Sequence, residues 1–297
     1  MDLSAGYDLS NKAFSIDLLM NDTFLAPWFA IAGRPELGGR INGSIKAEGN
    51  ASDLKRTRAA FDVSNLLLEL KGERIAETNG LHGTFNDGKF KIPRFNLDLL
   101  DQGNLRIGGS GDIFGDIEIN AEGEIPLKAA NVFVPDLQGI KGRLQVMTFV
   151  NGPLNRPKLE GTIKIVEGGF RIPELQQTIH EVNGQMTFAA GEDVMGRFSG
   201  MLDDGRFDLE AKIELDGFSP TWIDARMTAS ALPFKVPQTM EMLLSADLAM
   251  QGSPEDILVN GEIVLLEGLY YKNFKLNLLE AVQVKEREDT PPAVKEV

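Results

Sequence analysis

The residues best suited to acid–base or metal chemistry are few and scattered in this sequence. The two histidines, His82 and His180, are 98 positions apart (180 − 82), and neither has a serine or carboxylate pattern that would indicate a catalytic triad. The chain has no cysteine, which excludes disulfides, thiol catalysis and thiolate metal sites. We therefore expect no catalytic residue, no bound metal and no cofactor, and we predict that the protein is not an enzyme.

Some other residues are of types found in ligand sites, but the sequence around them does not match a known site. The run of residues 108–112, Gly-Gly-Ser-Gly-Asp, is similar to a calcium-binding β-roll repeat, but its Asp falls one residue early and the motif occurs once, which favours a turn. Carboxylates are abundant, so a pair suited to glycoside hydrolysis is an alternative that the sequence leaves open. Two isolated tryptophans, Trp28 and Trp222, are more typical of packing than of a sugar-stacking platform.

The composition is that of an acidic globular protein. Of the 297 residues, 42% are hydrophobic and 25% charged, and the formal net charge is −14. Because phosphate binding needs clustered Lys and Arg and we find no such cluster, we expect no nucleic-acid partner. No stretch is long and apolar enough to span a bilayer, and the first residues lack the pattern of a signal peptide. The sequence is therefore either a cytosolic protein or a piece of a larger protein, and the repeats described below favour the piece.

Alternation of apolar and polar residues is the dominant pattern, and it predicts β-strands with one solvated face. The clearest case is residues 207–216, where apolar side chains occupy one face and only charged ones the other. A second case runs through residues 117–125. Turn residues such as those at 203–205 and 167–169 separate the strands, so successive strands should pair antiparallel.

Helical periodicity is scarce in this chain. The segments 25–37, 126–137 and 232–244 break the alternation and contain proline, and we interpret each as one or two turns of helix or as a loop. The sequence therefore predicts an all-β fold.

The chain also repeats itself about every hundred residues. Pro35, Pro135 and Pro237 precede equivalent strands at offsets of 100 and 102 (135 − 35 and 237 − 135). Farther on, residues 159–165 align with residues 259–265, and both segments run into Glu-Gly and an aromatic residue. Because a unit with one apolar face cannot bury that face alone, the repeats should extend one continuous sheet.

No linker separates these repeats. We therefore predict a single elongated repetitive β domain over residues 1–284, with repeats of about 1–80, 81–181 and 182–280. Residues 285–297 are charged, contain two prolines and lack alternation, and we interpret them as a disordered tail or a truncated loop.

The segment from Asn151 to Ile165, Asn-Gly-Pro-Leu-Asn-Arg-Pro-Lys-Leu-Glu-Gly-Thr-Ile-Lys-Ile, carries a family resemblance. Together with the Glu-Gly-Gly and aromatic residue that follow, it resembles the TamB family of the AsmA-like superfamily. The third repeat departs from this pattern, with Ile257 in place of Asn155 and no proline before Val259. The resemblance extends over roughly residues 40–280.

This resemblance implies a fold, a location and a role. TamB-like proteins are anchored in the bacterial inner membrane, cross the periplasm, and form a long curved β-sheet folded into a trough with an apolar lining (a β-taco). They are implicated in moving phospholipid to the outer membrane. They are also implicated in protein secretion and outer-membrane protein assembly, as a translocation and assembly module with a BamA-like barrel partner. By this resemblance, the present chain is a periplasmic piece of an inner-membrane-anchored protein, without the anchor.

We accordingly predict a lipid-contacting groove built from the alternating strands. Withdrawing an acyl chain into water costs ~0.8 kcal/mol per CH₂, and a trough offsets that cost without any nucleophile or metal. The predicted lining consists of apolar residues on single strand faces: Ile117, Ile119, Ile125, Ile163, Ile165, Phe207, Leu209, Ile213, Leu215, Ile263 and Leu265.

Two other interpretations compete with the conduit. A tandem array of immunoglobulin-like sandwiches, as in adhesins, would also have units of about a hundred residues, although linkers are missing and aromatic residues are only 7%. A β-helix enzyme acting on polysaccharide is the third interpretation, although its period would usually be shorter. The sequence alone does not distinguish an open trough from a filled core.

Overall fold

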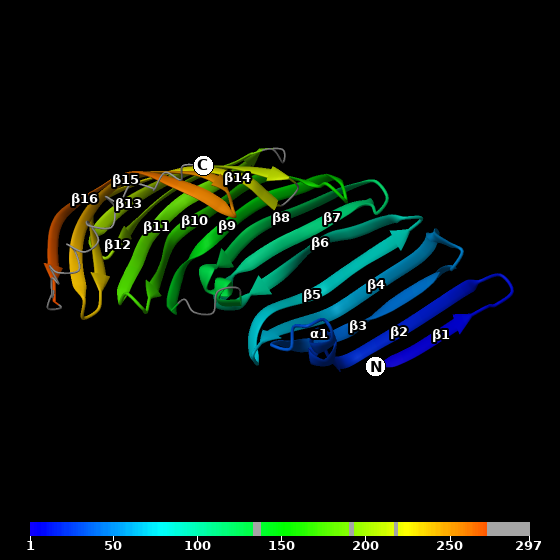
Figure 1. Ribbon diagram of the computed structural model, residues 1–297. Coiled ribbons are helices and arrows are strands. Elements are labelled where there is room, and N and C mark those ends of the chain that lie inside the picture. Colours follow the sequence, from blue (N-terminus) through cyan, green and yellow to red (C-terminus); the bar gives the residue numbers. More distant parts are fainter. Residues whose placement is uncertain (133–137, 190–192, 217–218, 272–297) are drawn as a thin grey trace, which may run out of the picture.

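One continuous sheet makes up nearly the whole molecule (Figure 1). The computed structural model describes residues 1–132, 138–189, 193–216 and 219–271. Its 16 strands lie in the sheet in the same order as in the sequence, from β1 to β16, and each pairs antiparallel with the next. The predicted elongated, curved, antiparallel all-β fold is confirmed.

The strands vary from 6 to 18 residues in length. They are β1 Asp2–Tyr7, β2 Ala13–Phe24, β3 Leu37–Asn50, β4 Asp53–Leu70, β5 Glu73–Asn86, β6 Lys89–Leu99, β7 Asn104–Asp112, β8 Asp116–Pro126, β9 Gln138–Pro153, β10 Lys158–Ile172, β11 Gln177–Ala189, β12 Asp193–Leu202, β13 Gly205–Asp216, β14 Ser219–Val236, β15 Met240–Ser253 and β16 Asp256–Tyr270. Three short helical segments join strands: α1 Ala26–Ile31, η1 Leu100–Gln102 and η2 Leu127–Val132.

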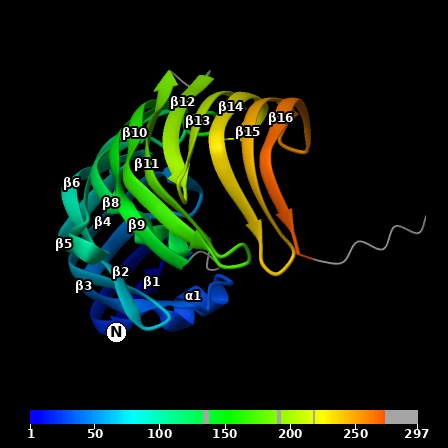
Figure 2. The same ribbon diagram turned by 90° about the vertical axis from the view of Figure 1, so that its left-hand side faces the viewer.

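The sheet is bent into an arch, which Figure 2 shows from its end. In the described part of the chain there is no second sheet that could pack against its inner surface. This arrangement is neither a series of sandwiches nor a β-helix, because both of those folds close their cores with further layers or turns of strand. The immunoglobulin-array and β-helix alternatives are therefore wrong.

Equivalent strands recur along the sheet at the spacing found in the sequence. Strands β3, β9 and β15 begin at residues 37, 138 and 240, which are 101 and 102 positions apart (138 − 37 and 240 − 138). The division into three repeats within 1–284 stays a prediction. The expected tail at 285–297 lies outside the described residues.

Bulges bend the long strands, and neighbouring asparagines support two of them. Glu167 has a φ of 52° in the middle of β10, and its freed N–H donates to the side chain of Asn183 at 3.0 Å. Asp22 in β2 has a φ of 44° and donates to Asn42 at 2.7 Å. The predicted turn at 167–169 is therefore wrong. A bulge needs the same left-handed backbone as a tight turn, so glycine-rich sequence indicates both.

The expected break at 232–244 is also wrong. Residues up to Val236 continue β14, and after a short connection β15 begins at Met240. Proline is tolerated at position 233 because β13 ends its pairing at Ser230, so this end of β14 is a local sheet edge.

The predicted turn at 108–112 is likewise a strand, the second half of β7. The segments 25–37 and 126–137 do contain the short helical segments α1 and η2, and residues 133–137 lie outside the described part.

A buried glutamine joins strands that are not sheet neighbours. Gln177 in β11 is 0% exposed; its Nε2 donates to the carbonyl of Pro233 at 2.6 Å, and its Oε1 accepts from the N–H of Lys235 at 3.1 Å. The side-chain amide thus hydrogen-bonds to the backbone of β14. It can reach β14 because the β12–β13 hairpin between them is shorter and ends before this point. At the opposite strand ends, Arg156 pairs with Asp216 at 3.0 Å across the end of the β11–β12 hairpin. These two contacts hold the arch between β10 and β14.

Candidate functional site

The inner face of the arch is a largely apolar surface. Across the sheet, Ile213 of β13 lies opposite Val194 of β12 and Ile223 of β14, and Val194 in turn lies opposite Phe188 of β11. From β7 to β16, the paired positions on this face carry no Asp, Glu, Lys or Arg. We call this surface the trough.

All the predicted lining residues lie on this face. Ile117 is only 4% exposed, so some side chains are fully buried even in this single-layer sheet. On the last strand, β16, Ile263 and Leu265 are 61% and 57% exposed, because no described strand follows. The remaining predicted residues are half-buried: Ile119, Ile125, Ile163, Ile165, Phe207, Leu209, Ile213 and Leu215. Their contact with lipid stays a prediction.

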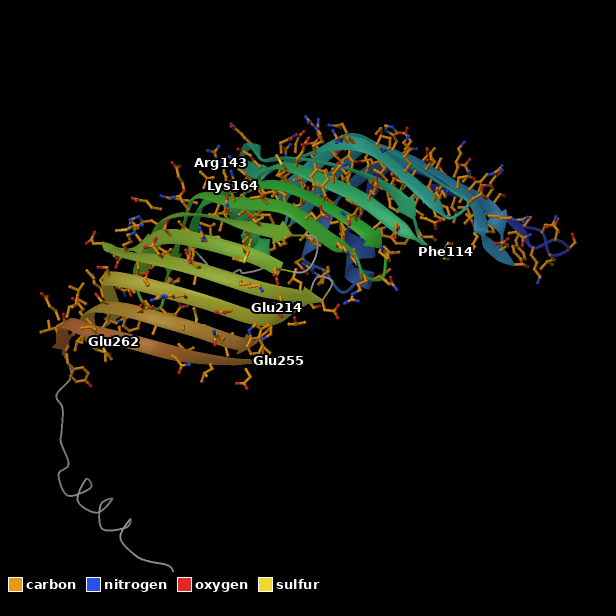
Figure 3. All side chains as sticks on the ribbon, turned by 90° about the horizontal axis from the view of Figure 1, so that it is seen from above. Phe114, Arg143, Lys164, Glu214, Glu255 and Glu262 are labelled. Atoms are coloured by element: carbon orange, nitrogen blue, oxygen red, sulfur yellow. The ribbon has the colours of Figure 1, made fainter. Side chains whose placement is uncertain are left out.

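The outer face of the arch is charged. Figure 3 shows Arg143, Lys164 and Glu262 on this convex side. Ion pairs link neighbouring strands there, the shortest being Arg226 with Asp247 at 2.6 Å. The guanidinium of Arg226 donates to the Asp247 carboxylate and lowers its pKa below the usual value. This face is therefore largely solvated, and the inner face is better suited to an apolar ligand.

Phenylalanine rings cover glycines on the floor of the trough, a feature that the strand pattern did not reveal. Phe61 in β4 lies directly opposite Gly83 in β5, and a methyl group added at Gly83 would be 2.5 Å from the ring. Phe207 in β13 covers Gly200 in β12 in the same way, with 2.7 Å to such a methyl group. Two further pairs repeat the arrangement: Phe14 over Gly49, and Phe198 over Gly184.

These pairs explain how a trough lined with large side chains stays open. A ring laid flat over a strand glycine shields that weak point of the sheet. It also occupies the floor and not the space above it. From the sequence alone, such a pair is only a Phe and a Gly on two different strands. It can be recognised only when the pairing register of those strands is known. The sequence spacing between Phe61 and Gly83 is 22 (83 − 61), whereas that between Gly200 and Phe207 is 7 (207 − 200), so no fixed spacing reveals the pairs.

The chemistry-bearing residues do not converge. His82 contacts the carbonyl of Gly80 at 3.1 Å, and His180 contacts that of Asp203 at 2.7 Å, each within its own part of the sheet. Among the described residues, no group of three His, Asp or Glu side chains is placed to hold a metal ion. The described helices are also too short or too polar for any of them to cross a membrane.

An open single-layer sheet, apolar inside and charged outside, defines this chain as a β-trough protein. Residues 196–293, which run from β12 through β16 and beyond the described part, match the family model of the TamB C-terminal domain. The match covers 98 of the 297 residues (293 − 196 + 1) and supports membership of the TamB family. This family serves in translocation and assembly and is not enzymatic. Neither the curated proteins nor the solved structures contain a match to the chain.

Proposed function

We propose that the trough carries the acyl chains of phospholipid between the inner and outer membranes of a bacterium. The observation that supports this most directly is the apolar inner face, which continues through the sheet and against which no second sheet packs in the described part of the chain. Contiguous exposed apolar surface of this kind marks a binding surface, because leaving it in water is unfavourable.

The energetics favour such a ligand. An acyl chain lying on the trough would recover ~0.8 kcal/mol per CH₂ that water would otherwise cost it. The side chains around Leu209 and Ile213 are half-buried, so they have surface left to give to a ligand. The polar headgroup would remain at the open side in water. From β7 to β16 the lining has no charged side chain, so it provides no strong electrostatic site at which a moving lipid would be trapped.

The same role sets a location and a partner. We place the chain in the periplasm, as part of an inner-membrane-anchored protein, and we propose a BamA-like outer-membrane barrel as its partner in protein assembly. Among the described residues, no strand pairs with the outer edge of β16, so an added strand would find unpaired backbone there. Photo-crosslinkers on Glu262 in cells should capture the barrel protein, whereas crosslinkers on Lys164, in the middle of the outer face, should not.

Photo-crosslinkers on one strand provide the direct test of lipid binding. Leu209 and Ile213 face the trough, and Glu210 and Lys212 on the same strand face outward. Crosslinkers at the first two positions should capture phospholipid in cells, and those at the outward positions should not. Equal capture at all four positions, or none at Leu209 and Ile213, would show that the conduit proposal is wrong.

Gly83→Ala should obstruct the trough while leaving the fold intact. The groups that the new methyl would meet are the Phe61 ring and the Ile92 side chain, not backbone, so the ring should lift into the trough. We expect a stability loss of about 1 kcal/mol and a severalfold drop in crosslinked phospholipid. The matched control is Gly83→Ala combined with Phe61→Leu, which keeps the methyl but removes the ring. If the double variant captures no more lipid than Gly83→Ala, ring displacement is not the cause.

A further inference from the structure

Methionines are unevenly distributed along the trough. Between residues 37 and 172 the sequence contains a single methionine, Met147, and it lies on the outer face with 60% exposure. Strands β11, β14 and β15 place a set of methionines on the inner face: Met186, Met227, Met240, Met242 and Met250. All of them are half-buried.

The part of the trough formed by β3 to β10 is lined by other types of side chain. Strands β3 to β10 present mostly branched and aromatic residues to the trough, for example Ile45, Val63 and Ile119. β-Branched side chains are held in one preferred rotamer, so they give the trough a fixed contour. Methionine is unbranched, has three rotatable bonds and a polarizable sulfur, and fills irregular space.

Small residues are the neighbours of several of these methionines. Met250 lies opposite Ala225, which is 6% exposed, and Met227 lies on the same face of β14 between Ala225 and Ala229. Met242 lies opposite Gly268 of β16. These small neighbours carry no branched side chain that would fix the rotamer of the methionine beside them. The contour of this stretch is therefore set mainly by unbranched methionine side chains.

We propose that the section of the trough from β11 to β15 is an adaptable, methionine-lined binding segment that accepts bent acyl chains, in particular cis-unsaturated ones. The proposal rests on the lipid-carrying function proposed above and specifies the ligand class of that site. A cis double bond bends a hydrocarbon chain, and a bent chain loses contacts on a rigid lining. Methionine side chains restore those contacts by rearranging around the bend.

The test compares two lipids that differ only in chain shape. The purified chain is offered an equimolar vesicle mixture of dioleoyl phosphatidylcholine, with cis double bonds, and isotopically labelled dielaidoyl phosphatidylcholine, with trans double bonds. The bound ratio is read by mass spectrometry. The variant carries Met227→Ile, Met242→Ile and Met250→Ile. We expect its cis-to-trans ratio to fall about fourfold, equivalent to roughly one methylene group losing its contact.

A second triple variant is the matched control. Met147→Ile, Met195→Ile and Met201→Ile make the same exchange on the outer face and should leave the ratio unchanged. A wild-type chain that takes up neither lipid overturns the lipid-carrying function and this inference with it. Uptake of both lipids with an unchanged ratio in the inner-face variant overturns the inference alone.

Oxidative footprinting of the wild-type chain keeps the inference testable if the inner-face variant fails to fold. Bound dioleoyl lipid should protect Met227, Met242 and Met250 from peroxide severalfold. Met147 and Met195, which are 60% and 51% exposed on the outer face, should oxidise at the same rate with and without lipid. If the inner-face methionines oxidise equally in both states while lipid is bound, the segment does not hold the chain.

Discussion

Replacing Ile213 with Asp should leave the protein folded and abolish its capture of phospholipid. Ile213 is half-buried on the inner face, so a carboxylate there keeps part of its hydration and should cost about 1 to 2 kcal/mol of stability. An acyl chain passing over that carboxylate would have to desolvate an unpaired charge, which costs several kcal/mol more. Thermal unfolding measures the first effect, and photo-crosslinking from Leu209 measures the second.

Two matched substitutions separate these effects. Met195→Asp introduces the same charge on the neighbouring strand but on the outer face, where Met195 is 51% exposed, and it should change neither stability nor lipid capture much. Ile117→Asp places the charge where the side chain is 4% exposed and should unfold the protein. If Ile213→Asp unfolds the chain as Ile117→Asp does, this part of the trough is an ordinary core.

Gly39→Ala should be among the most destabilising single changes in the sheet. Gly39 has a φ of 138°, and an added Cβ would lie 2.0 Å from the carbonyl oxygen of Leu67 on the next strand. The left-handed backbone and the clash with main chain together should cost more than ~2 kcal/mol. A large drop in the urea midpoint with an unchanged slope would report this loss.

The adjacent glycine provides the control for that experiment. At Gly38 the nearest atom to an added Cβ is Oε2 of Glu69 at 3.6 Å, an ordinary contact with a flexible side chain. Gly38→Ala should therefore shift the midpoint little. If both substitutions lowered the urea midpoint equally, the clash and the backbone strain at Gly39 would not be the cause of the lost stability.

Local alternation was enough to predict several of the strands and the face on which their apolar residues lie. In β13 each side chain from Phe207 to Asp216 is on the face that the sequence pattern assigned. The pattern holds because a strand in a single-layer sheet has one apolar and one solvated side along its whole length. The strong local signal needs no knowledge of the neighbouring strands.

Features that depend on neighbouring strands could not be predicted in this way. Glu167 was assigned to a turn because a bulge and a turn share one local backbone conformation, and only the paired strand β11 distinguishes them. The end of β14 was expected to be irregular because of Pro233, whose tolerance depends on the early end of β13. The covered glycines likewise depend on cross-strand register. None of these is a property of a short window of sequence.

The order of the strands has a consequence for how such a molecule can change its reach. Each strand pairs only with its neighbours in the sequence, so a block of hairpins could be inserted or deleted without rerouting the rest of the chain. The recurring unit from β3 to β9 comprises six strand steps (9 − 3), which at ~4.8 Å per strand adds about 29 Å. The length of a sheet of this design can therefore be adjusted in increments of one unit.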